Sequence, residues 1–313
     1  MDDQKIGAWF AISPGPHSPL LRLARVLRTS ALVPVSDAFR ANSERSLSIS
    51  AIPPSLFSLG KRVKLAEIAA SLMLFNDPRY ENQSMPIEMG QRYQGLLNDL
   101  LTGTVNGPFR LAPGEIATSH FTDHAAEQFS SMYDTLMLSQ LLLVWTSFET
   151  MAGDLWETAL NIHPTLLASL RGTRGGPKDE TKKLPIRYLE EHGYNLEHHM
   201  GTVLKDRFLF TKLDGIEEAY HSAFPNDCRV ACKDFWEDPS LKAVSALRNL
   251  IVHRTCIVDK EFLAKRGPDP RIAHLALNDR FLPNGEMLSR LFADLFTFSA
   301  SLISLVDDWL ATH

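Results

Sequence analysis

Cysteine is scarce in this chain, with only three among 313 residues. So few thiols, odd in number, cannot form a complete disulfide framework, which excludes the disulfide-stapled class of small secreted domains. The N-terminus also lacks the basic and apolar segments of a secretory signal, because Met1 is followed by two aspartates. We therefore expect a protein of a reducing compartment, with a cytoplasmic location as the default.

Long hydrophobic runs and an excess of positive charge are missing as well. No uninterrupted apolar stretch approaches the ~20 residues that span a bilayer, so we expect a soluble protein with no membrane partner. The 37 acidic residues outnumber the 32 basic ones, which gives a formal net charge of −5. RNA binding would therefore depend on local basic patches, and residues 242–254 and 171–187 form two of them.

The order of segments predicts an N-terminal region and a main helical domain. The first fifty residues contain four prolines and many serines, show no sustained period, and receive no predicted role. Helical stretches are expected over residues 55–75 and 86–101, followed by a loop rich in Gly and Pro over 103–114. We thus predict a helical accessory region over residues 1–114 and a main domain over 115–313.

The main domain begins with a long amphipathic pattern over residues 121–162. One apolar stripe comprises Met137, Leu141, Val144, Phe148, Met151 and Leu155. A second stripe, about 100° round the helix, comprises Leu138, Leu142, Trp145 and Trp156. This helix should therefore face two partners. Shorter helices over 185–235, a helix over 239–256 and a terminal helix over 286–310 complete a predicted all-α bundle.

The predicted helix over residues 239–256 has two chemically different faces. One arc is apolar and must face the core, since it carries Val244, Leu247, Leu250 and Ile251. The opposite arc presents a hydroxyl, a guanidinium, an amide and an imidazole together, from Ser245, Arg248, Asn249 and His253. Within residues 242–254 there are Lys and Arg residues, including Arg254, but no acid.

The run from Arg248 and Asn249 to His253 resembles the motif of the HEPN superfamily of all-α domains. That motif is an Arg, four to six intervening residues and a His, often with a polar residue directly after the Arg. The family places it on a late helix of a small bundle, after a long early helix that often carries a Phe and Glu pair, which Phe148 and Glu149 resemble. The resemblance covers roughly residues 115–313.

Many HEPN proteins are metal-independent endoribonucleases, and the resemblance implies that activity here, with no cofactor and no metal. RNA supplies its own nucleophile, the 2′-OH, so cleavage needs proton transfer and stabilisation of the charge on phosphorus. We expect His253 to act as base or acid and Arg248 to hold the scissile phosphate. Asn249 would fix the imidazole or hold a phosphate oxygen.

The resemblance also implies partners and a biological setting. HEPN nucleases build one cleft from two subunits, so we expect a homodimer whose motif helices face each other, with RNA as substrate. Toxin, stress or antiviral defence biology is the suggested setting, and a regulatory or antitoxin protein is left open as a partner. The toxin branch paired with a nucleotidyltransferase antitoxin has Tyr two residues after the His, whereas this chain has Thr255, so that partnership is not supported. The alternative is a noncatalytic HEPN-type module that binds RNA or protein and dimerises.

Glu149 falls within the second apolar stripe, where an unpaired carboxylate would be costly. We expect it to pair with Arg248 and to orient that guanidinium. The alternative is a surface Glu at the edge of the bundle.

Several histidines and cysteines are spaced closely enough to suggest a metal site. His120 and His124 lie one helical turn apart, a second histidine group surrounds Glu197, and Cys228 and Cys232 stand four residues apart. None of these groups completes a zinc ligand spacing. We therefore predict surface histidines and buried thiols there.

Overall fold

The computed structural model describes residues 27–49, 91, 94–95, 123–164, 166 and 186–313. The chain is mainly helical, as predicted, and the described residues contain no strand beyond an isolated bridge between Ile257 and Arg280. The stretches predicted as helices over 55–75 and 86–101 lie almost entirely outside the described residues. The same holds for the loop over 103–114 and for nearly all of the basic stretch 171–187.

The described helices follow one another in this order: η1 (Ser30–Leu32), α3 (Val33–Ser48), α6 (Asp123–Ile162), α7 (Ile186–Glu191), α8 (Met200–Lys205), α9 (Leu213–Ala223), η6 (Arg229–Ala231), α10 (Lys233–Trp236), α11 (Pro239–Arg254), α12 (Lys260–Lys265) and α13 (Gly285–Thr312). The helices predicted over 121–162, 239–256 and 286–310 correspond to α6, α11 and α13. The shorter helices predicted between 185 and 235 correspond to α7 through α10.

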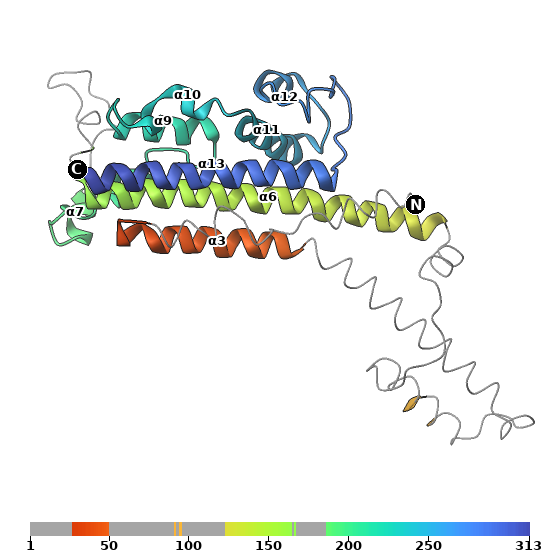
Figure 1. Ribbon diagram of the computed structural model, residues 1–313, viewed down its shortest axis with the longest axis horizontal. Coiled ribbons are helices and arrows are strands. Elements are labelled where there is room, and N and C mark those ends of the chain that lie inside the picture. The colour runs from red at the N-terminus through yellow and green to blue at the C-terminus, as the bar shows by residue number, and fades with distance from the viewer. Residues whose placement is uncertain (1–26, 50–90, 92–93, 96–122, 165, 167–185) are drawn as a thin grey trace, which may run out of the picture. The chain divides into compact units, whose positions relative to one another are not determined.

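The two longest helices form the centre of the bundle. α6 and α13 lie side by side and run in the same direction (Figure 1). The rings of Phe148 and Phe298 are 6.0 Å apart, and further along both helices His163 lies 5.3 Å from Trp309. The first apolar stripe of α6 is buried throughout, as predicted. Its second stripe is buried at the two tryptophans and half-buried at the two leucines, so α6 does face two sides.

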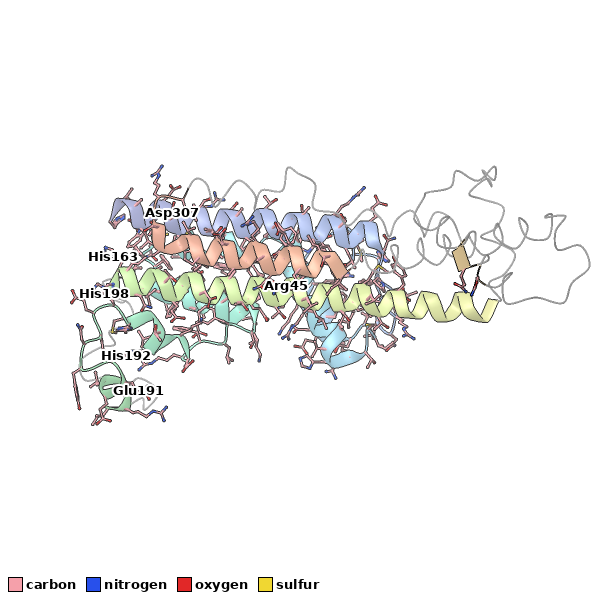
Figure 2. All side chains as sticks on the ribbon, turned by 90° about the horizontal axis from the view of Figure 1, so that it is seen from below. Arg45, His163, Glu191, His192, His198 and Asp307 are labelled. Atoms are coloured by element: carbon pink, nitrogen blue, oxygen red, sulfur yellow. The ribbon has the colours of Figure 1, made fainter. Side chains whose placement is uncertain are left out.

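α3 was not predicted from the sequence. Its buried positions include Ser36, Ser43 and Ser46 besides Phe39 and Leu47, so the helix shows no clear apolar period. α3 lies along α6 and α13, on the side away from α9–α12 (Figures 1 and 2).

Contacts near its two ends show that α3 runs antiparallel to α13. Just before η1, the backbone N–H groups of Arg28 and Thr29 donate to the Asp307 carboxylate at 2.8 and 2.7 Å. Further along α3, the Phe39 ring lies 6.2 Å from that of Phe296. α3 belongs to the same compact unit as residues 134–313, whereas residues 51–133 belong to another.

Hydrogen bonds from large side chains fix α9 against α6. Trp156 Nε1 donates to the carbonyl of Ala219 at 2.9 Å, and the Tyr220 hydroxyl donates to the carbonyl of Ala152 at 2.8 Å. Both side chains are fully buried. Because buried Trp and Tyr need partners for their polar atoms, these bonds set α9 in one position on α6.

α11 has a well-defined beginning and end. The Asp238 side chain accepts hydrogen bonds from the backbone N–H groups of Ser240 and Leu241, and Pro239 occupies the first turn. The helix ends at Arg254 because Thr255 and Cys256 both adopt left-handed backbone angles, with φ of 48° and 67°. Val244, Leu247 and Leu250 are buried and Ile251 is half-buried, which matches the predicted apolar arc.

By length and composition α13 could cross a membrane, and among the described helices it is the only one that could. Its most apolar window is 56% buried inside the protein. The buried positions include Leu288, Phe292, Leu295, Leu302 and Val306. Packing against α6, α3 and α11 therefore accounts for the apolar composition of this helix.

Candidate functional site

A charged network joins α6 to α11 at the predicted motif. Arg248 Nη2 lies 3.8 Å from Glu149 Oε1, and the same carboxylate oxygen accepts a 2.5 Å hydrogen bond from Trp145 Nε1. The expected pairing of Glu149 with Arg248 is therefore present. Trp145 was missed as a partner, although its position one helical turn before Glu149 was a signal that the sequence offered.

Burial changes the acid–base behaviour of Glu149, whose side chain is only 9% exposed. Desolvation raises the pKa of this carboxyl, and the Trp145 hydrogen bond and the Arg248 charge oppose that rise. The Arg248 side chain is 23% exposed. One end of the guanidinium is thus held by the bundle while part of it still reaches solvent.

Asn249 extends this network along the surface of α11. Its side-chain oxygen accepts a hydrogen bond from Arg248 Nη1 at 3.0 Å. With Glu149 near Nη2 and Asn249 on Nη1, the orientation of the guanidinium is set from two sides. An oriented guanidinium can bind a phosphate through its remaining donors.

His253 lies exposed on the last turn of α11. It makes no hydrogen bond or ion pair with any residue that the structure describes. Asn249 bonds Arg248 in this structure, so the predicted contact in which Asn249 fixes the imidazole is not made. Ser245 is half-buried one turn earlier on the helix.

The basic patch over residues 242–254 is more neutralised than the sequence indicated. Arg254 Nε bonds Asp259 at 2.6 Å, and Lys242 bonds Glu237. Both acids lie just outside residues 242–254, one before this segment and one after it, and the folded backbone places each next to a basic side chain of the segment. Arg248 and His253 therefore remain as the groups of this patch with the most capacity for an added anion.

The motif residues lie at the surface of the chain, half-buried at Arg248 and Asn249 and exposed at His253. Two cavities of about 640 and 960 Å³ occur in the described part of the protein. Neither is lined by Arg248, Asn249 or His253. The motif residues are therefore open to solvent on the surface of α11.

The described histidines and cysteines that were candidates for metal ligands do not converge on one point. Among the described residues no three His, Cys, Asp or Glu side chains are placed to hold one metal ion. The rings of His192 and His199 stack at 4.3 Å, and His198 approaches the end of α6 through the carbonyl of Asn161 (Figure 2). Cys228 is buried and Cys232 is exposed. His120 and the side chain of His124 lie outside the described residues.

Comparison with known proteins adds no family to this description. Neither protein-family models, nor curated proteins, nor solved structures gave a match to the chain. The functional assignment below therefore depends on the site's own chemistry and on the motif resemblance.

Proposed function

We propose that this chain is a metal-independent endoribonuclease that cleaves RNA by attack of the 2′-OH at a site shared by two subunits. The observation that carries the proposal is the placement of Arg248. Its guanidinium is oriented by Glu149 and Asn249 and remains partly exposed on the helix that also presents His253. Phosphate binding and proton transfer are thus available on one surface.

The proposed reaction uses a base, an acid and a cation that binds phosphate. A base removes the 2′-OH proton, and the resulting oxygen attacks phosphorus to give a 2′,3′-cyclic phosphate. The bond from phosphorus to the 5′-oxygen breaks, and that oxygen takes a proton from an acid. His253 supplies the base or the acid, and Arg248 stabilises the negative charge that develops on the phosphoryl oxygens.

A homodimer follows from the same step. One chain contributes one motif histidine, whereas the reaction uses both a base and an acid. A two-fold axis beside α11 would bring in the second His253 and a second Arg248. Val252 and Ile257, which flank His253, are exposed large apolar residues, and a subunit contact would cover such side chains.

The deciding experiment is cleavage of labelled single-stranded RNA by the purified protein in excess EDTA. We expect cleavage that is lost in His253→Ala and kept in His198→Ala, which removes another exposed imidazole. The products should carry 2′,3′-cyclic phosphate and 5′-hydroxyl ends, and DNA of the same sequence should survive because it lacks the nucleophile. Ends with 5′-phosphate, or dependence on added divalent metal, would contradict the mechanism.

The alternative is a noncatalytic HEPN-type module for RNA or protein binding and dimerisation. In that case RNA would bind and stay intact, and His253→Ala would change affinity alone. The two outcomes are separated by running the cleavage assay and an RNA-binding assay on the same preparations.

A further inference from the structure

A cavity of about 640 Å³ lies beside the motif helix, where the segment 271–282 meets the first turns of α13. This size is within the range of pockets that hold small ligands. Nothing in the motif resemblance predicted it. Its lining contains both basic and apolar side chains. A ligand that fits it would therefore carry a negative charge and an apolar group.

Two basic side chains of this cavity have no partner among the described residues. Arg280 and His274 form no hydrogen bond or ion pair with the described residues. Arg271, which also lines the cavity, is occupied by Asp269 and Asp294.

The remaining charged groups of the lining form no ion pair with Arg280. The Asp279 carboxylate accepts from the backbone N–H of Ala276 at 2.7 Å, and Glu286 pairs with Arg290 at 2.6 Å. Arg280 and His274 are therefore the groups of this cavity that are available to an added anion.

The apolar part of the lining comes from Leu275, Phe281, Leu282 and Met287. Leu282 is 62% exposed, so its side chain is accessible to a ligand that enters the cavity. An anion alone would gain nothing from this surface. A ligand that carries a flat apolar ring next to a phosphate would use both parts.

Backbone hydrogen bonds tie this cavity to the end of the motif helix. Val258 N donates to the Asp279 carbonyl, Phe281 N donates to the Cys256 carbonyl, and Ile257 forms a bridge with Arg280. Only four positions separate His253 from Ile257. The Cα atoms of His253 and Arg280 are therefore at most about 20 Å apart, a span that a few nucleotides of a strand can cover.

We propose that this cavity binds a nucleoside phosphate, with the phosphate on Arg280 and His274 and the base against Leu282 and Met287. Two sources have this chemistry, a nucleotide of an RNA strand that flanks the cleaved bond and a free mononucleotide. We assign the strand, a choice that rests on the proposed ribonuclease function, because the cavity adjoins the motif helix.

The test uses the full chain with the substitution His253→Ala, so that RNA stays intact, in buffer with EDTA. Binding of a fluorescein-labelled single-stranded RNA is followed by anisotropy. We expect Arg280→Ala to weaken binding about tenfold, the loss of one charge-assisted contact. The slope of log affinity against log salt should fall by about 0.7, the contribution of one phosphate of a single strand.

Arg229→Ala is the matched control, because Arg229 is exposed and lies outside this cavity. Leu282→Ser tests the base contact through competition by AMP and by ribose 5-phosphate. The serine variant should lose the preference for AMP over ribose 5-phosphate. Circular dichroism of each variant confirms that the helices remain.

The outcomes separate the proposal from the function on which it rests. Equal weakening by the Arg280 and Arg229 variants, or none by either, overturns the cavity assignment even where the wild-type chain cuts RNA. Binding that depends on Arg280, without any cleavage by the wild-type chain, supports the cavity and removes the ribonuclease function. If AMP displaces the labelled RNA at concentrations far below the nucleotide concentration at which the RNA saturates the protein, the ligand of the cavity is a free nucleotide. That result would overturn the strand as the source.

Discussion

Glu149 and Arg248 meet across the contact of α6 with α11, with Oε1 and Nη2 3.8 Å apart, and Trp145 donates to the same carboxylate oxygen. The carboxylate thus accepts a neutral donor from its own helix and faces a cation from the neighbouring one. This arrangement holds the guanidinium at a fixed place on the surface of α11.

We predict that Glu149→Gln lowers RNA cleavage about tenfold, which corresponds to roughly 1.4 kcal/mol of transition-state stabilisation. The amide keeps the shape and can still accept from Trp145, but it lacks the charge that orients Arg248. Helical circular dichroism should stay nearly unchanged. Glu218→Gln, at an exposed position of α9, serves as control, and full activity in the Glu149 variant would remove its orienting role.

The raised pKa of Glu149 predicts a pH dependence of stability with a definite sign. Below its ordinary pKa of 4.5 the carboxyl is protonated in the folded and the unfolded chain alike. Above that value the unfolded chain releases the proton before the folded chain does, so the native state loses stability as the pH rises. Urea unfolding of wild type and Glu149→Gln between about pH 4 and pH 7 should show the variant gaining relative stability with pH. A constant difference, or the reverse trend, would contradict this reading.

Subunit exchange provides a test of the shared site. Wild-type protein is mixed with an excess of His253→Ala protein and allowed to exchange subunits. Most wild-type chains then enter mixed dimers, so activity should fall well below that of a mock-mixed sample at the same wild-type concentration. Activity that follows the wild-type concentration alone, from a species that light scattering measures as a monomer, would sink the dimer model.

Asp307 is predicted to hold the N-terminal segment on the bundle. Its side chain is buried, and it accepts from the backbone N–H groups of Arg28 and Thr29. Asp307→Asn keeps one acceptor oxygen and should cost about 1–3 kcal/mol, seen as faster hydrogen exchange in residues 30–48. The matched control is Asp308→Asn, whose exposed pair with Arg28 contributes little. Equal protection in both variants would show that Asp307 does not hold this segment.

The parts of the fold that the sequence predicted are those with strong local patterns. The period of leucines and aromatic residues in α6 and α13 identified both helices, and Pro239, which suits a first turn, marked the start of α11. α3 could not be found in this way, because serines fill several of its buried positions and small polar groups carry no apolar period. Its place depends on α13, a contact between distant segments.

The sequence predicted part of the candidate site. The apolar stripe around Glu149 correctly predicted its pairing with Arg248, whereas the bonds of Trp145 to Glu149 and of Arg248 to Asn249 were not predicted. The pairing of Arg254 with Asp259 was missed, because a helical wheel describes one helix and Asp259 follows the left-handed turn at Thr255 and Cys256. The cavity beside Arg280 was missed for the same reason, since its walls come from two segments that local periodicity does not connect.

The bonds between Arg28 and Asp307 join positions 279 residues apart in the chain. Contacts so distant in sequence form late in folding, because a long loop has to close before they exist. The contacts among α9, η6, α10 and α11 need only short loops and can form early. α3 should therefore be the last described helix to reach its place, and a refolding experiment with a probe on α3 should report a slower phase than one on α11.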